Sequence, residues 1–229
     1  MRVYHYLEAK WALDNIRRRR LKLSKIDDMN DPWEWKCVRS DDRRMQEGLD
    51  ETARQTFQEF GVACFSRIWN NVLMWSHYGD KHKGICLGFD VPDDRIRTIK
   101  YESEIEVVGS LRDVLPRHVE TEGTRILDKL FETKYLGWLY EEEIRVHGRR
   151  EVKDEETGFY FADFDDGLVL REVIAGPRYR LSEKPITDAL KGYAEAVDVK
   201  KATISSTQFE IVIAENGFHD GKAAQVIRD

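Results

Sequence analysis

The sequence predicts an α+β fold, and two observations carry that prediction. Apolar residues alternate with polar ones in many short segments, which is typical of strands, and helix-like segments fall between them without a strict alternation. The 229 residues are 41% hydrophobic and 11% aromatic, which suffices for a large core, and the formal net charge is −6. We therefore expect one globular domain, 1–229, with mixed, mostly antiparallel sheets and flanking helices.

Strands are predicted where apolar residues alternate, or where a short apolar run is bounded by turn residues. Leu21 and Leu23, for example, alternate with polar residues just after the basic run Arg17 to Arg20. Gly176 and Pro177 end another such segment, because neither residue continues a strand well. The predicted strands are 2–6, 21–24, 61–66, 83–89, 96–101, 143–146, 159–164, 168–175 and 208–213.

Helices are predicted where apolar residues recur three or four positions apart. The first one follows the first strand and carries Ala12, Leu13 and Ile16 on one face. Ser182 is a candidate cap for the last one. The predicted helices are one around 12–16, one over 41–60, a short aromatic one between 66 and 83, one around 126–131, and one reaching from 186 to 197.

Charge, cysteines and hydropathy limit the classes of function. An acidic chain is a poor general nucleic-acid binder. Cys37, Cys64 and Cys86 are odd in number and widely spaced, which predicts reduced thiols rather than disulfides or a zinc site. The first residues mix charge with aromatic groups, unlike a signal peptide, and no stretch approaches about 18 apolar residues. We expect a cytoplasmic protein with no membrane partner.

The first of three candidate clusters is Tyr4-His5-Tyr6 on the first predicted strand. Side chains alternate in a strand, so His5 faces away from the two tyrosines. A core histidine bonded to a backbone carbonyl is the simpler interpretation, and catalysis is the alternative.

The second cluster lies in the aromatic helix and the turn after it, residues 70–84. Helical spacing puts Trp75 and Tyr78 on one stripe, with Tyr78 at the helix end before Gly79. This helix either plugs the sheet or forms the wall of a ligand site. His77 and His82 are five residues apart, which does not suit a metal site.

The third cluster is the segment 138–147. Taken as one strand, it places Glu141, Glu143, Arg145 and His147 on one face, while Glu142 conflicts with the core face. The acidic residues could form a surface ion-pair ladder, worth only about 0–1 kcal/mol, or could include a site glutamate that steadies a developing cation. The segment 30–34 is interpreted first as a turn and only second as a site wall.

Taken in order, several short motifs resemble the bacterial domain-of-unknown-function 2971 family, which carries no established reaction. A more distant resemblance is to ADP-ribosyltransferases, in which an early His or Arg, a middle aromatic or serine region and a late Glu follow one another. Here that order is His5, then Ser66 or Tyr78, then 141–143. The motifs that carry the first resemblance are Tyr4-His5-Tyr6, 30–34, 64–66, 74–78, 82–84, 138–145 and 173–176.

The second resemblance implies NAD as the substrate and nucleotide ligand, bound between two small sheets. His5 would hold a ribose and Tyr78 would stack on nicotinamide, while Ser66, Trp75 and Arg145 would complete the binding site. No metal is implied, and the fold would be ADP-ribosyltransferase-like.

The same resemblance implies how the reaction would be catalysed. An ionised Glu143 would bond the ribose 2′-hydroxyl and stabilise the oxocarbenium-like state, with Arg145 keeping it ionised. Glu141 would orient or deprotonate the acceptor. Such an enzyme would be an ADP-ribosyltransferase or NAD glycohydrolase, as found in bacterial toxin or phage-defence systems, with an antitoxin as a partner.

Two other classes of function stay open from the sequence. One is a metal-dependent enzyme that processes nucleotides or nucleic acids, in which Asp31, Glu34, Glu141 and Glu143 gather a divalent cation. The other is a non-enzymatic module whose aromatic residues bind a ligand or peptide.

Overall fold

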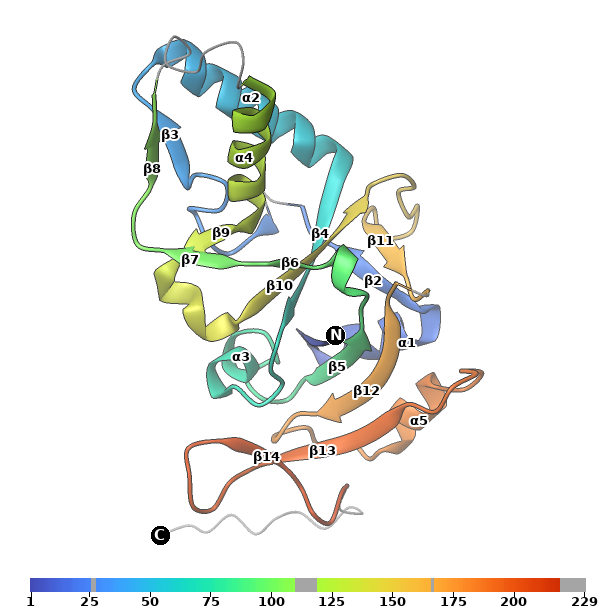
Figure 1. Ribbon diagram of the computed structural model, residues 1–229. Helices are drawn as coiled ribbons and strands as arrows, with labels where there is room; N and C mark the ends of the chain where they lie inside the picture. Colours follow the sequence, from blue (N-terminus) through green and yellow to red (C-terminus); the bar gives the residue numbers. More distant parts are fainter. Residues whose placement is uncertain (26–27, 110–118, 166, 219–229) are drawn as a thin grey trace. The chain divides into compact units, whose positions relative to one another are not determined.

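Strands and helices are mixed along the chain, which confirms the predicted α+β class (Figure 1). The computed structural model describes residues 1–25, 28–109, 119–165 and 167–218. The helices are α1 (Ala9–Arg18), α2 (Arg43–Glu59), α3 (Val72–His77), α4 (Val119–Glu132) and α5 (Lys184–Ala189), with 3-10 helices η2 (Asp93–Arg95) and η3 (Leu136–Glu141). The strands are β1 (Arg2–Leu7), β2 (Arg20–Leu23), β3 (Val38–Ser40), β4 (Phe60–Ser66), β5 (Ile85–Asp90), β6 (Arg97–Thr98), β7 (Lys100–Glu102), β8 (Glu106–Val108), β9 (Thr133–Tyr135), β10 (Glu143–Arg149), β11 (Tyr160–Asp163), β12 (Val169–Ala175), β13 (Asp198–Ile204) and β14 (Ile211–Ile213).

The chain divides into two compact units, which are described separately. The first unit consists of Met1–Arg20, Ile68–Val91 and Phe164–Asp229, and the second of Leu21–Arg67 and Pro92–Asp163. In the part of the chain that the structure describes, no helix is long and apolar enough to cross a membrane.

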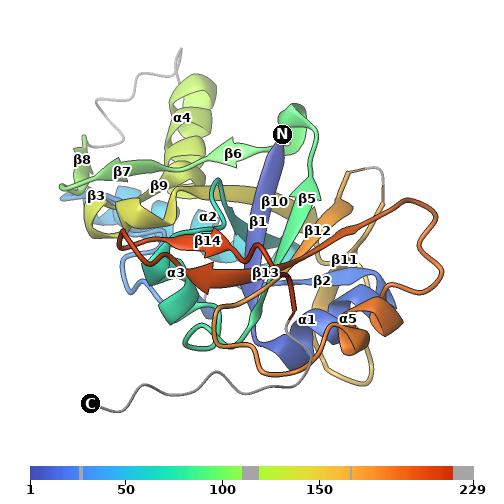
Figure 2. The same cartoon turned by 90° about the horizontal axis from the view of Figure 1, so that it is seen from below.

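The first unit is built on neighbouring strands in the order β14-β13-β12-β5-β1. These strands are antiparallel to their neighbours except for the parallel pair β12–β13. Helices α1 and α5 lie side by side in this unit (Figure 2). The face of α1 that carries Ala12, Leu13 and Ile16 is buried, as its spacing predicts.

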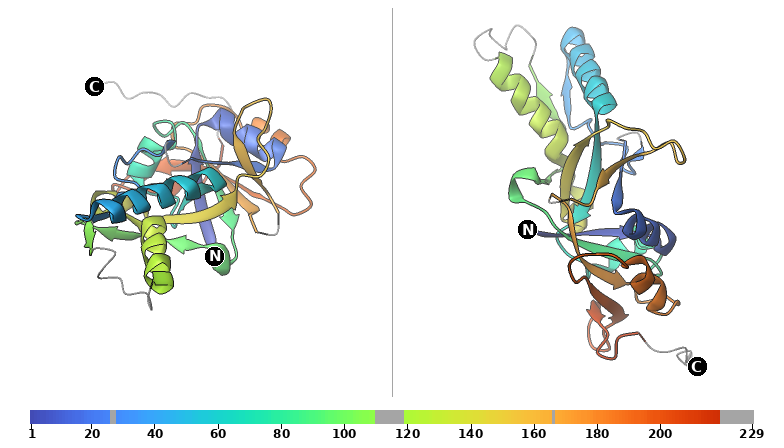
Figure 3. Two further views of the ribbon diagram at one scale, coloured as in Figure 1. Left: turned by 90° about the horizontal axis from the view of Figure 1, so that it is seen from above. Right: turned by 90° about the vertical axis from the view of Figure 1, so that its right-hand side faces the viewer.

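The second unit contains the antiparallel strands β4, β10 and β6, with β10 in the middle. Three shorter pairs accompany them: β2 with β11, and the parallel pairs β3–β8 and β7–β9. Helices α2 and α4 lie next to one another and both contact β3 (Figure 3). Asp42 begins α2 by accepting hydrogen bonds from the amides of Arg44 and Met45.

The predictions for the last helix are wrong in two respects. Helix α5 begins after Glu183, and no side chain caps it, so Ser182 is not its cap. It ends at Ala189, well before Val197, because Gly192 turns the chain with a φ of +82°. The Tyr193 hydroxyl then donates to the Ile16 carbonyl at 2.7 Å, which fixes the segment against α1.

Candidate functional site

The segment predicted as a turn, 30–34, is a tight turn of the second unit. The Trp33 amide donates to Asp31 Oδ1 at 2.9 Å, and the Glu34 amide donates to the Asp31 carbonyl at 3.1 Å. Trp35 ends the turn with a φ of +63°, a left-handed conformation that a tryptophan adopts only at some cost. These bonds confirm the turn chemistry of the sequence.

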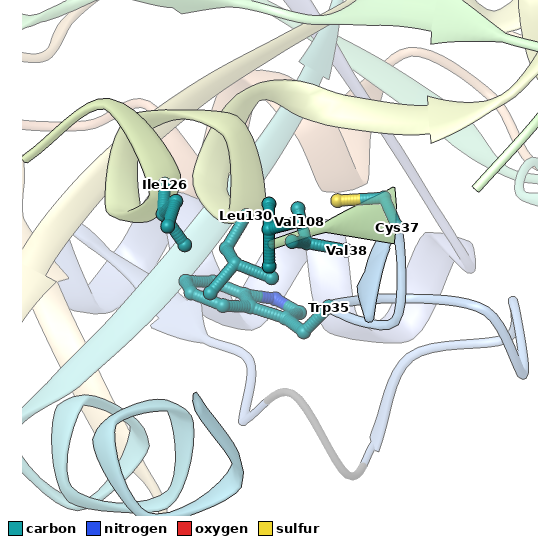
Figure 4. Packing of buried hydrophobic residues seen from close by; sticks show 6 residues of the cluster. All are labelled: Trp35, Cys37, Val38, Val108, Ile126 and Leu130. Carbon is teal, nitrogen blue, oxygen red and sulfur yellow. The ribbon is translucent and has the colours of Figure 1, made fainter. Parts of the chain in front are cut away.

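Packing around Trp35 holds the turn in place (Figure 4). Its ring contacts Phe131 of α4 edge-on, with centroids 4.2 Å apart. Phe131 in turn meets the His147 ring at 4.7 Å. The buried members of this hydrophobic cluster are Trp35, Cys37, Val38, Val108, Ile126 and Leu130. The strained residue is therefore held by tertiary contacts, and it fixes the position of Glu34 just before it.

The acidic segment 138–147 has two parts, of which only the second is a strand. Leu136–Glu141 is the 3-10 helix η3, and β10 begins only at Glu143. Between them, Glu142 takes a left-handed conformation with a φ of +44° and is exposed. This turn removes the conflict of Glu142 with the core face and separates Glu141 from the strand, which begins at Glu143 as predicted.

Glu143 and Arg145 nevertheless share a face of β10, as the period of a strand requires. Both are buried, at 4% and 0% exposure. In the register with β4, Glu143 stands opposite Ser66 and Arg145 opposite Cys64. A central strand thus carries charged side chains into the interior of the second unit.

These side chains belong to a buried network of charges. Arg145 donates through Nε to Glu143 Oε1 at 2.8 Å and through Nη2 to Glu34 Oε1 at 2.7 Å. Lys134 of β9 donates to Glu141 Oε2 at 2.5 Å and to Glu143 Oε2 at 3.0 Å. Its Nζ lies 3.7 Å from Glu34 Oε1. The network comprises the carboxylates Glu34, Glu141 and Glu143 and the cations Lys134 and Arg145.

The charges of the network shift the pKa values of its members in different directions. Burial opposes ionisation of Glu143, but Arg145 and Lys134 outweigh it and lower the pKa of Glu143 to about 2. Burial raises the pKa of Glu34, and the nearby Glu143 adds to this against the pull of Arg145. With all groups ionised, three carboxylates face two cations, so one negative charge is left over.

A cavity of about 720 Å³ lies beside the turn. Its size is in the range of small-molecule sites, roughly 300–1,000 Å³. Its wall comes from the turn region, from one face of α2 and from the end of β10. The lining residues are Lys25, Met29, Asp31, Pro32, Glu34, Trp35, Lys36, Asp50, Ala53, Arg54, Gln58 and Arg150.

Two acidic residues in the cavity wall carry an unused oxygen each. Asp31 and Glu34 are 4% and 6% exposed. Asp31 Oδ2 and Glu34 Oε2 are buried and have no hydrogen-bond partner. Buried carboxylate oxygens without donors are costly, and a water, an ion or a group of the reaction supplies the missing donor in many proteins. We therefore take the cavity, with the charge network behind it, as the candidate site.

The structure brings together four of the residues that the sequence singled out. Glu143 and Arg145 contact directly, Glu141 shares Lys134 with Glu143, and Ser66 lies opposite Glu143 on the neighbouring strand. Ser66 is fully buried. Their link to the cavity is Glu34, which Arg145 contacts.

His5, Trp75 and Tyr78 lie in the first unit, whereas the network lies in the second. His5 is half-buried in the middle of β1, and Tyr78 is half-buried at the end of α3. Trp75 has 0% exposure, and its indole N–H donates to the Trp69 carbonyl at 2.7 Å. A ring with no exposed face has the character of a core residue. The roles predicted for these residues in binding NAD stay predictions.

Two cationic side chains lie among the glutamates that the metal-dependent alternative assigns to a divalent cation. Lys134 Nζ and the Arg145 guanidinium stand among Glu34, Glu141 and Glu143, where the metal would be. Within the described ranges, no group of three or more His, Cys, Asp or Glu side chains is arranged to hold a metal ion. The positive charge at the centre of this network comes from the protein itself.

The sequence did not point to Lys134, and it gave Glu34 only a minor place. Lys134 lies on a strand of three residues that the sequence does not predict, paired with Tyr101 of β7. The Tyr101 hydroxyl accepts a hydrogen bond from the Glu143 amide at 2.7 Å, which ties these strands to β10. A lone lysine between Thr133 and Tyr135 gives no signal of its own, because its partners are set by tertiary structure.

The comparisons with known proteins cover part of this region. No curated protein and no solved structure gives a significant match to the chain, and nothing among the comparisons supports the resemblance to ADP-ribosyltransferases. A family model described as "Protein of unknown function (DUF2971)" matches residues 74–146. The matched segment contains Lys134, Glu141, Glu143 and Arg145 but not Glu34. Over this segment the chain is similar to that family, as the motifs 74–78, 82–84 and 138–145 predict, whereas the other motifs lie outside the matched residues.

Proposed function

We propose that the second unit binds NAD in its cavity and breaks the bond between nicotinamide and ribose, acting as an NAD glycohydrolase or ADP-ribosyltransferase. In this proposal Glu34 is the catalytic carboxylate. Arg145 and Glu143 are positioning residues, because they hold Glu34 and do not line the cavity.

The observation that carries the proposal is the buried, unpartnered oxygen of Glu34, in a network with one more carboxylate than cations. Glu34 Oε1 is bonded to Arg145 at 2.7 Å, while Oε2 is buried without a partner. A carboxylate that is short of positive charge favours a ligand that brings a cation, or that develops one during reaction. The pyridinium ring of NAD carries such a charge, and the ribose acquires it as the bond breaks.

The reaction requires no redox partner. The bond between ribose C1′ and the nicotinamide nitrogen breaks, its electron pair leaves with neutral nicotinamide, and the ribose becomes an oxocarbenium ion. Ionised Glu34 stabilises that cation, and Asp31 Oδ2 accepts from a ribose hydroxyl. The oxygen of water, or of an acceptor, then bonds to C1′, and its proton passes to solvent water.

The fixed network supports this chemistry because it needs little reorganisation. Arg145 is held on three sides, by Glu34, by Glu143 and by the Phe131 carbonyl at 3.3 Å. Charges that are fixed before the reaction stabilise a transition state better than charges that must move. The proposal gives the catalytic role to Glu34 and not to Glu143, because both oxygens of Glu143 are already paired.

Release of nicotinamide from NAD tests the proposal. The wild-type protein is expected to release it, and Glu34→Gln is expected to lose about a hundredfold or more of that rate. Glu47→Gln, on exposed α2, removes a carboxylate outside the cavity and should keep the rate. Absence of release by folded wild-type protein, or equal rates in Glu34→Gln and wild type, would contradict the proposal.

We also propose that such an activity acts in a toxin or defence setting with an inhibitory partner. Depletion of NAD would then slow the growth of a host that expresses the wild-type chain alone. The Glu34→Gln chain, at the same soluble level, should leave growth normal. Equal growth of the two hosts would count against this setting.

A further inference from the structure

The lysines of the cavity wall suggest where the charged part of a ligand lies. Lys25 and Lys36 both line the cavity. Neither has a carboxylate partner within 4.0 Å among the residues that the structure describes, whereas many exposed lysines of this chain are paired. Among the described residues, no carboxylate therefore competes with a ligand for either ammonium group.

The acidic and basic groups of the wall differ in depth. Asp31 and Glu34 are nearly fully buried, whereas Lys36 and Arg54 are exposed and Lys25 is half-buried. The buried end of the cavity is thus negative and accepts hydrogen bonds. Its outer part carries Lys25, Lys36 and Arg54 against the exposed Asp50 and is positive on balance. A ligand that matches both has hydroxyl groups or a cation at one end and an anion at the other.

We propose that Lys25 and Lys36 form a phosphate-binding subsite at the outer part of the cavity, which selects ribosyl compounds that carry a diphosphate. The inference rests on the proposed function and narrows its substrate: the ribose that reacts lies near Glu34, and the diphosphate lies against the two lysines. Lysine binds phosphate as a point charge with three donors, so it tolerates more than one phosphate orientation.

Arg54 supports the subsite from α2, although it is not free. Its guanidinium pairs with Glu51 on the same helix, and it is exposed. A diphosphate that reached Arg54 would compete with Glu51 for it. For this reason the lysines, and not Arg54, are assigned the main contacts.

Isothermal titration with ADP-ribose, inorganic pyrophosphate and nicotinamide riboside tests the subsite without requiring a reaction. ADP-ribose carries the diphosphate and nicotinamide riboside lacks it. In the double variant Lys25→Met/Lys36→Met, the dissociation constant for ADP-ribose should rise roughly tenfold. That for nicotinamide riboside should stay the same. The binding of ADP-ribose to the wild type should also weaken as salt is raised.

Lys153→Met is the matched control, because Lys153 is exposed, lies in the same unit and does not line the cavity. It should bind ADP-ribose like the wild type. Unchanged ADP-ribose affinity in the double variant, an equal loss in Lys153→Met, or no binding of ADP-ribose or pyrophosphate to the wild type would each overturn the subsite.

The two proposals fail in different ways. Salt-dependent ADP-ribose binding that needs the lysines, without release of nicotinamide from NAD, would keep the subsite and reject the proposed reaction. Release of nicotinamide with unchanged ADP-ribose affinity in the double variant would keep the reaction and reject the subsite.

Discussion

Arg145 Nη2 donates a hydrogen bond to Glu34 Oε1 at 2.7 Å, although 111 residues separate the two in the chain. The same guanidinium also binds Glu143, its neighbour on the same face of β10. One arginine therefore couples the turn that lines the cavity to the central strand of the second unit. This coupling makes the network both a structural element and the support of the candidate site.

Loss of Arg145 should destabilise the second unit strongly. In Arg145→Met, Glu34 and Glu143 lose their shared partner and stay buried, which is expected to cost about 3–5 kcal/mol. Arg149→Met on the same strand removes an exposed arginine and should change the unfolding free energy by less than about 1 kcal/mol. Urea denaturation of both variants measures the difference. A loss for Arg145→Met no larger than that for Arg149→Met would show that the network carries little stability.

Glu34→Gln, unlike Arg145→Met, should keep or raise the unfolding free energy. Burial raises the pKa of Glu34, so ionisation of this residue costs folding stability as the pH rises through its folded-state value. The amide removes that cost, and we expect the variant to be as stable as the wild type at pH 7, or more stable by about 1–2 kcal/mol. The difference should shrink toward pH 4. Thermal unfolding across this pH range checks it, and a marked loss at pH 7 would show that Glu34 is mainly structural.

His147 should make the stability depend on pH between 6.5 and 4. Burial and the charge of Arg145 lower the pKa of His147 from 6.5 to about 4. A histidine with a lowered folded-state pKa stabilises the fold above the unfolded-state value, and that stabilisation is lost as the pH falls toward 4. The whole effect amounts to at most roughly 3 kcal/mol. In His147→Leu the unfolding free energy should vary less across this range, and an unchanged slope would exclude His147 as its source.

Two glycine substitutions should have opposite effects. A Cβ on Gly84 would lie 2.0 Å from the Leu7 carbonyl oxygen, so Gly84→Ala must shift the backbone of the first unit. We expect a loss of about 2–4 kcal/mol. Gly48 lies inside α2 with nothing within 4 Å of its Cβ position, so Gly48→Ala should stabilise by about 0.5–1 kcal/mol. The unfolding midpoints of the two variants test this, and shifts of the same sign would contradict the described packing.

The glycine at 84 also ends an unusual turn of the first unit. Asp80, Lys81 and His82 have φ values of +46°, +52° and +72°, so three consecutive residues are left-handed. The Gly84 amide closes the turn by donating to the Gly79 carbonyl at 2.8 Å. The sequence predicts a turn here from Gly79, but it contains no sign of such a conformation, because the contacts that hold it come from distant segments.

The sequence predicts local features of the site better than their combination. Alternation alone places Glu143 and Arg145 on one face, and turn chemistry alone explains the segment that ends at Glu34. What joins them is tertiary: Glu34 and Lys134 reach Arg145 and Glu143 only when separate strands and the turn pack together. The predicted strand 143–146 is confirmed, and the interpretation of the wider segment 138–147 as one strand does not hold because Glu142 takes a left-handed conformation, which residue pattern does not reveal.

The sequence favours Glu143 over Glu34 as the catalytic residue, because the contacts of Glu34 are long-range and leave no mark in the sequence. The catalytic role of Glu143 stays a prediction. In the sequence Glu143 stands beside Glu141 and Arg145, as a reactive carboxylate would. In the structure both of its oxygens are bonded, at 2.8 Å to Arg145 and at 3.0 Å to Lys134. Glu34, in contrast, has one carboxylate oxygen, Oε2, without a hydrogen-bond partner, and only the tertiary structure reveals this difference.

The central claim is that Glu34 acts on the ribosyl cation and does not merely shape the cavity. Its most direct test compares, for Glu34→Gln and wild type, the rate of nicotinamide release from saturating NAD and the dissociation constant for ADP-ribose. In Glu34→Gln we expect the rate to fall by about a hundredfold or more, while the dissociation constant for ADP-ribose changes by less than about threefold. Equal rates in the two proteins, or a loss of rate explained entirely by lost ADP-ribose binding, would contradict that claim.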